Sequence, residues 1–84
     1  MKTTFEEKDG KFVMYFEGRL DTAAASKTEQ EMKVLYDCEG HDIILDCSKL
    51  DYISSSGLRL FLGLLKTARN KNSKVLISGM NDIA

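Results

Sequence analysis

Three consecutive serines, Ser54, Ser55 and Ser56, are the side chains of this sequence best placed for chemistry. They follow a polar stretch and precede Gly57, where a leucine-rich helical pattern begins. The first N–H groups of a helix have no partner within it, and the helix dipole is positive at this end. A serine here either caps the helix or, once phosphorylated, holds its phosphate against free N–H donors. The residues alone leave both interpretations open.

A phosphate on one of these serines would work as a binding switch. It adds a charge of about −1.5 to −2 at pH 7 to a surface otherwise made of small neutral groups. Arg59 lies one turn beyond Ser55 and can pair with such a phosphate. A partner that docks on the neutral surface would therefore be released when the serine is modified.

Catalytic and cofactor chemistry has weaker support in the sequence. A hydrolase needs a base beside its serine, but the single histidine, His41, precedes an expected strand at 43–45, at the opposite end of that strand from the serines. No glycine-rich nucleotide-binding motif occurs. Cys38 and Cys47 do not form a C-x-x-C pair, and one histidine adds little to a metal site. We therefore expect no catalytic residue, no metal and no cofactor, and two free thiols.

Length and charge restrict the class of protein further. The 84 residues make one domain at most, and 12 basic residues against 13 acidic ones leave a net charge of −1. This balance lacks the basic surface of a nucleic-acid binder; a local cluster at 66–74 is interpreted as a solvated helix end. No apolar run approaches the ~18 residues of a membrane helix, and the N-terminus does not read as a secretory signal. We expect a soluble cytoplasmic protein that binds no nucleic acid and does not insert into a membrane.

The first half of the chain reads as a hairpin followed by a helix. Strand formers occupy 3–7 and 11–17 around Asp9-Gly10, a pair that favours a type I′ turn. The segment 18–22 is expected to break the second strand, and Asp21 or Thr22 to cap a helix over 22–38. Gly40 then suits the left-handed residue that ends a helix.

The second half continues with a strand at 43–45, a loop over 46–57, a helix over 56–70 and a strand at 75–78. The order β-β-α-β-α-β predicts an α/β fold with a mostly parallel sheet and an antiparallel edge hairpin. Continuous apolar runs at 12–16 and 43–45 predict strands covered on both faces.

The helix expected at 56–70 has a wide apolar arc. One stripe repeats at the spacing of a helix face and a second lies beside it; the two stripes contain Leu58, Phe61, Leu62 and Leu65, and Leu60 and Leu64. A helix packed on one side needs a narrower arc. Another element or a partner must therefore cover the second stripe.

Two motifs at a suitable spacing resemble a known family. The segment from Asp46 to Leu58, DCSKLDYISSSGL, resembles the signature of STAS domains found in anti-sigma factor antagonists, and Gly18-Arg19-Leu20-Asp21 is similar to the family's Gly-x-Leu-Asp. The resemblance covers nearly the whole chain. It implies a STAS-like (SpoIIAA-like) fold with helices packed on the sheet, a single domain over 1–84, and a binding module that is not an enzyme.

The resemblance also implies a mechanism. Ser55 matches the family's phosphorylated serine, with Ser54 and Ser56 as alternatives, since the family often has Asp where Ser54 stands. The expected partner is an anti-sigma factor that is also a serine kinase; the unphosphorylated protein binds it and frees a sigma factor, and a PP2C-type phosphatase resets the switch. The expected partner-binding residues are Asp21, Tyr52, Ile53, Ser54, Ser55, Ser56, Gly57, Leu58 and Arg59.

Two alternatives and one difference in length accompany this interpretation. STAS domains also serve as subunits of lipid-transport ABC systems, and some are interaction modules that are never phosphorylated. The family's domain normally continues after the strand at 75–78 with a helix, a strand and a second helix, and 81–84 would only begin that helix. We therefore expect a domain incomplete at its C-terminus, which self-associates as a homodimer or exchanges elements with a second copy.

Overall fold

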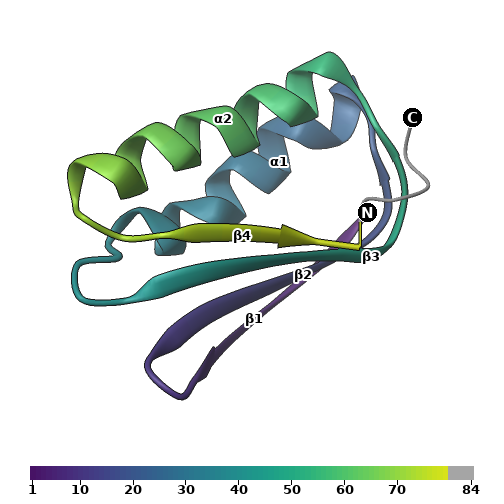
Figure 1. Ribbon diagram of the computed structural model, residues 1–84. Helices are drawn as coiled ribbons and strands as arrows, with labels where there is room; N and C mark the ends of the chain where they lie inside the picture. The colour runs from purple at the N-terminus through teal and green to yellow at the C-terminus, as the bar shows by residue number, and fades with distance from the viewer. Residues whose placement is uncertain (80–84) are drawn as a thin grey trace.

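A four-stranded sheet with two helices packed on one face makes up the fold (Figure 1), and the computed structural model describes residues 1–79. The elements are β1 (Lys2–Lys8), β2 (Lys11–Leu20), α1 (Thr22–Met32), the 3₁₀ helix η1 (Lys33–Tyr36), β3 (Asp42–Ile53), α2 (Ser55–Asn70) and β4 (Val75–Ser78). The predicted order β-β-α-β-α-β is confirmed. The further helix expected to begin at 81–84 lies outside the described residues.

The sheet has the predicted mixed topology. Its strand order is β1-β2-β3-β4, with β1 antiparallel to β2, and with β3 parallel to both of its neighbours. Asp9 and Gly10 have φ values of 54° and 76°, as the predicted type I′ turn requires. Each parallel pair is joined through one of the helices, which is why both helices can lie side by side on the sheet.

The loop predicted over 46–57 is wrong, because β3 continues to Ile53. Two bulges interrupt the alternation of inward and outward residues by which a strand is recognised. Tyr15 pairs with Asp46 and Glu17 with Lys49, so two residues of β3 oppose one residue of β2. The second bulge lies between Gly18, which pairs with Leu50, and Arg19, which pairs with Tyr52, so β3 again has one extra residue. The Asp46 carboxylate holds the first bulge by accepting hydrogen bonds from the Ser48 backbone N–H (3.0 Å) and Oγ (2.6 Å).

The expected strand break at 18–22 and the expected helix end at 38 also need correction. Gly18 has a φ of 104° but stays within β2, which continues to Leu20. Helix α1 ends at Met32 and tightens into η1. Side chains 35 positions away hold the segment after η1 in place: Lys71 Nζ donates to the Tyr36 carbonyl at 2.6 Å, and Ser73 Oγ to the Cys38 carbonyl at 2.8 Å.

The core lies between the sheet and the helices, and the opposite face of the sheet is open. Phe16 and Phe61 meet at 5.2 Å between ring centroids inside this core. The prediction that 43–45 is covered on both faces is therefore wrong: Ile44 is only half-buried. Val13 is buried on the open face (7 % exposed), where its strand partners are Glu6 and Ile44.

Helix α2 has more apolar surface than the described part of the chain covers. Leu60, Phe61 and Leu64 are buried against the sheet and α1. Leu58 and Leu62 remain 44 % and 49 % exposed, and Leu65 is half-buried. The wide apolar arc predicted from the sequence thus leaves an uncovered stripe, Leu58, Leu62 and Leu65, which we call the α2 stripe.

Candidate functional site

The two helices begin side by side at one end of the sheet (Figure 1). A backbone hydrogen bond makes this arrangement: the Ser54 N–H donates to the Leu20 carbonyl at 2.8 Å, joining the last residue of β2 to the residue that follows β3. Because β2 and β3 are parallel, their carboxyl ends lie at the same edge. The two motifs singled out in the sequence therefore meet here.

Each helix start is capped by a side chain from one of these motifs. Asp21 Oδ1 accepts a hydrogen bond from the Ala24 N–H at 2.9 Å, and Ser54 Oγ accepts one from the Gly57 N–H at 3.1 Å. Asp21 is thus the cap of α1, and Thr22 is the first helical residue. Capping satisfies backbone donors that would otherwise lack a partner.

Gly57 of one motif packs directly against Leu20 of the other. Gly57 is buried, and a Cβ atom at this position would lie 2.7 Å from Leu20 Cγ and 3.1 Å from Ile53 Cγ1. Helix α2 therefore approaches β2 and β3 more closely than any side chain would allow. Ile53 and Gly57 were predicted to lie on the partner-binding surface. Ile53, at the end of β3, is half-buried and packs against the core, and Gly57 is buried in the first turn of α2.

The three serines have different surroundings. Ser54 is 7 % exposed and its Oγ is engaged as the cap. Ser55, the first residue of α2, is exposed. Ser56 is half-buried beside a hollow of about 210 Å³ between the helices, whose lining includes Glu29 and Arg59. Ser55 is thus the member of the run whose side chain is open to a large partner.

The exposed residues around Ser55 form a surface of mixed character, which we call the α2-start surface: Tyr52, Ser55, Leu58 and Arg59. Arg19 extends it, because its guanidinium carbon lies 4.5 Å from the centre of the Tyr52 ring. Arg19 was not among the residues predicted to bind a partner. Its place in Gly-Arg-Leu-Asp beside Asp21 is the signal that points to it.

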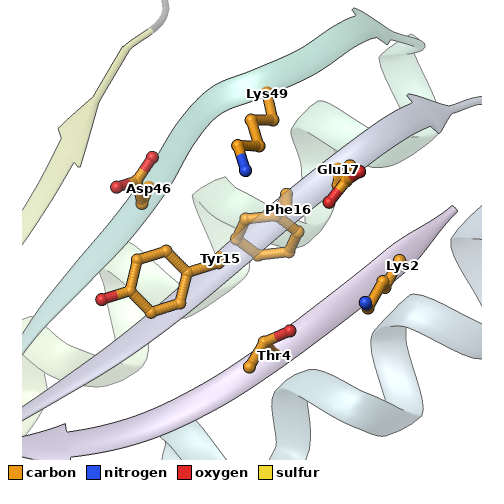
Figure 2. Close-up of a pocket in the computed structure, with 7 residues that line it drawn as sticks. All are labelled: Lys2, Thr4, Tyr15, Phe16, Glu17, Asp46 and Lys49. Carbon is orange, nitrogen blue, oxygen red and sulfur yellow. The ribbon is translucent and has the colours of Figure 1, made fainter.

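A second hollow, of about 270 Å³, lies on the open face of the sheet (Figure 2). Lys2 and Thr4 of β1, Tyr15 and Glu17 of β2, and Asp46 and Lys49 of β3 spread around it. Small-molecule sites are larger, about 300–1,000 Å³, and gather polar groups toward one point. Here two of the polar groups are engaged locally: Asp46 accepts a hydrogen bond from Ser48, and Tyr15 donates one to Glu6 at 2.9 Å.

The remaining reactive side chains lie away from the α2-start surface or are buried. His41 precedes β3 and stacks on Phe12 at 4.3 Å, at the opposite end of the strand from Ser55. Cys38 and Cys47 are free and buried, and burial raises the pKa of Cys47 to about 11. Within residues 1–79 no group of three metal-binding side chains occurs, and none of the helices there is long and apolar enough to cross a membrane.

Comparisons with known proteins agree with this arrangement. The chain is 32 % identical over 92 % of its length to BtrV of Bordetella bronchiseptica, named as a candidate anti-sigma factor antagonist. It is 28 % identical over 82 % of its length to the anti-sigma-B factor antagonist of Listeria monocytogenes. The chain spans 66 % and 60 % of the lengths of these two curated relatives.

Solved structures show the same fold. The anti-sigma factor antagonist SpoIIAA in its unphosphorylated form superposes with a TM-score of 0.74 at 19 % identity, over 90 % of this chain and 71 % of SpoIIAA. Bacillus SpoIIAA in its phosphorylated form superposes with a TM-score of 0.70. The STAS domain family model matches residues 2–83. With both motifs at the shared edge of the sheet and this match over nearly its whole length, the chain belongs to the STAS domain family.

Proposed function

We propose that this protein is an anti-sigma factor antagonist that binds a kinase-type anti-sigma factor through the α2-start surface and is released when Ser55 is phosphorylated. The observation that carries the proposal is the exposed Ser55 hydroxyl at the first position of a helix whose cap is another residue, Ser54. The protein would act in the cytoplasm as a docking module with no catalytic residue of its own.

Ser55 is the favoured acceptor because the neighbouring serines are less accessible. Ser54 is 7 % exposed and holds the Gly57 N–H, so a kinase would have to break the cap to reach it. Ser56 is half-buried beside the hollow between the helices. The N–H groups of Ser55 and Ser56 have no acceptor within the helix, so a phosphate on Ser55 has donors beside it.

The release step follows from charge on a compact docking face. Leu58 and Tyr52 supply apolar contact, and both are more than 40 % exposed. A phosphate between them adds a charge of about −1.5 to −2, which a partner must either neutralise or desolvate. An unpaired charge buried in an interface costs about 2–5 kcal/mol, enough to weaken binding by roughly 30-fold or more.

The relatives' names support the partner. Two curated relatives carry names of anti-sigma factor antagonists, and the similar SpoIIAA structures include a phosphorylated form. The kinase would transfer the γ-phosphoryl group of ATP to the Ser55 hydroxyl, and a PP2C-type phosphatase would remove it. The family's alternative role, a subunit of a lipid-transport ABC system, uses the same fold without this cycle.

The proposal is tested by incubating the protein with ATP and the serine kinase encoded nearest in the genome, followed by peptide mass spectrometry. We expect phosphate on Ser55. Ser55→Ala should abolish incorporation, and Ser26→Ala is the matched control, since Ser26 is an exposed serine within α1. Ser55→Asp should weaken docking while Ser55→Ala retains it. No phosphate, together with stable binding to an ABC ATPase, would move the function to transport.

A further inference from the structure

Arg19 is an exposed cation that is held in place without an ion pair. Its guanidinium carbon lies 4.5 Å from the centre of the Tyr52 ring, so the ring covers one side of the charged group. Within residues 1–79 no carboxylate forms an ion pair with it. Asp21, two positions along the chain, accepts a hydrogen bond from the Ala24 N–H instead. The N–H donors at the edge of the guanidinium therefore have no acidic partner among these residues.

The second bulge of β3 is the reason that Arg19 faces a ring rather than a carboxylate. Gly18 pairs with Leu50, so a regular ladder would set Arg19 opposite Asp51. Two directly opposed residues of opposite charge attract each other and would form an ion pair. Because the bulge inserts Asp51 as the extra residue, Arg19 pairs with Tyr52 instead. The path of the backbone thus leaves the positive charge of Arg19 unpaired.

The stacked pair of Arg19 and Tyr52 lies next to the residue proposed to control docking. The next residue of β2, Leu20, accepts a hydrogen bond from the Ser54 N–H at 2.8 Å. Ser55 then begins α2 with an exposed side chain. Arg19 therefore lies at the border of the α2-start surface, where a docked protein would meet it together with Ser55.

We infer that Arg19, held by Tyr52, is a specificity-determining residue that binds a carboxylate of the docked anti-sigma factor. The inference rests on the proposed function, because it takes the α2-start surface as the docking face. A guanidinium presents its N–H donors in a plane and can bind a carboxylate through two parallel hydrogen bonds. Since the ring already fixes the position of the group, docking orders little further side-chain freedom. The occupant is an aspartate or glutamate side chain of the partner.

A partner carboxylate at this position also connects recognition with release. The whole chain has a net charge of −1 and offers an acidic protein no general attraction, so the contact with Arg19 is local. A phosphate on Ser55 has the same sign of charge as the carboxylate that Arg19 binds, so the two repel each other within one interface. Phosphorylation thus opposes the attraction that Arg19 supplies.

The contact is tested by isothermal titration calorimetry of the full chain with the serine kinase encoded nearest in the genome. Arg19→Gln should raise the Kd about tenfold or more, and the Kd of this variant should depend less on salt than that of the parent. Arg69→Gln is the matched control, because Arg69 is an exposed arginine in the last turn of α2. Its Kd should equal that of the parent.

Two results of this titration would count against the inference, and they are distinguishable. If Arg19→Gln binds with the parent's Kd while phosphorylation of Ser55 still releases the kinase, the carboxylate contact is overturned and the proposed function stands. If the parent does not bind the kinase at all, both are overturned. Equal urea midpoints for the parent and Arg19→Gln will show that the substitution leaves the fold intact.

A charge exchange identifies the carboxylate and separates a direct contact from a structural effect. Arg19→Glu should weaken docking more than Arg19→Gln, because it sets two carboxylates against each other. The exposed Asp and Glu residues of the kinase are then replaced by lysine one at a time. We expect one of these kinase variants to bind the Arg19→Glu protein more tightly than it binds the parent. If none of them restores binding, Arg19 does not bind a carboxylate of the partner.

Discussion

Replacing Gly57 by alanine should destabilise the protein although the change favours helix formation. Gly57 lies within α2, where alanine normally gains about 0.5–1 kcal/mol over glycine. Its new Cβ would lie 2.7 Å from Leu20 Cγ and 3.0 Å from Leu20 Cδ2. The shorter distance is roughly 0.8 Å below the ~3.5 Å at which carbon atoms pack. Leu20 is fully buried and cannot move aside freely.

Overpacking of this kind costs about 1–3 kcal/mol, so we expect a net loss of about 0–2.5 kcal/mol for Gly57→Ala. Gly63→Ala is the matched control in the same helix. Its Cβ would meet only the Tyr36 hydroxyl oxygen at 3.8 Å, so this variant should gain up to about 1 kcal/mol. The difference between the two variants measures the contacts of the new Cβ with Leu20 and Ile53.

Urea unfolding followed by circular dichroism measures both free energies. A double-mutant cycle adds a second check. With Leu20→Ala as background the two shortest contacts are removed and only the one with Ile53 Cγ1 at 3.1 Å remains, so Gly57→Ala should cost much less than in the parent, although Leu20→Ala alone costs about 2–5 kcal/mol. If Gly57→Ala were as stable as Gly63→Ala in the parent background, the close approach of α2 to β2 would be refuted.

Three further predictions concern single side chains. Ser54→Ala should lower the free energy of unfolding by about 1 kcal/mol through loss of the α2 cap, and Ser54→Asp should retain it, as urea unfolding will show. Hydrogen bonds from Ser48 lower the pKa of Asp46 below 3.8, so Asp46 stabilises the fold above that pH and loses its contribution as the pH falls. Asp46→Asn should therefore flatten the acid limb of a stability–pH curve, by less than about 1 kcal/mol for so exposed a pair. Burial raises the pKa of Cys47 from 9.0 to about 11, so its native thiol should react with a disulfide reagent at neutral pH far more slowly than in denaturant, and rapid native labelling would contradict that burial.

Features set by neighbouring residues were predictable from the sequence, and features set by distant ones were not. The Asp9-Gly10 turn and the Asp21 cap depend on residues within a few positions of each other, so the local sequence predicts both. The long β3 strand was hidden because its two bulges replace alternation with inward residues every third position, at Cys47 and Leu50. Only the pairing with β2 shows that this stretch is a strand.

The end of α1 and the coverage of the sheet were mispredicted for the same reason. No residue near Tyr36 in the sequence indicates that Lys71 will donate a hydrogen bond to the Tyr36 carbonyl, or that α1 will be followed by η1. The apolar residues at 43–45 suggested burial on both faces, yet both helices pack on one. At the site, the sequence identified the serine run and Asp21. It did not show that Ser54 is the cap and Ser55 is exposed, because this depends on the path of β3.

The hydrogen bonds of Lys71 to Tyr36 and of Ser73 to Cys38 also affect the opposite end of the molecule. They tie the segment after α2 to the segment after η1, so the two helices are joined at both ends, here and through Ser54 and Leu20. If the α2-start surface binds a partner as proposed, these ties hold it in its binding geometry before the partner arrives. Docking then loses little conformational entropy, and amides in both helices should exchange with solvent together, as one cooperative unit.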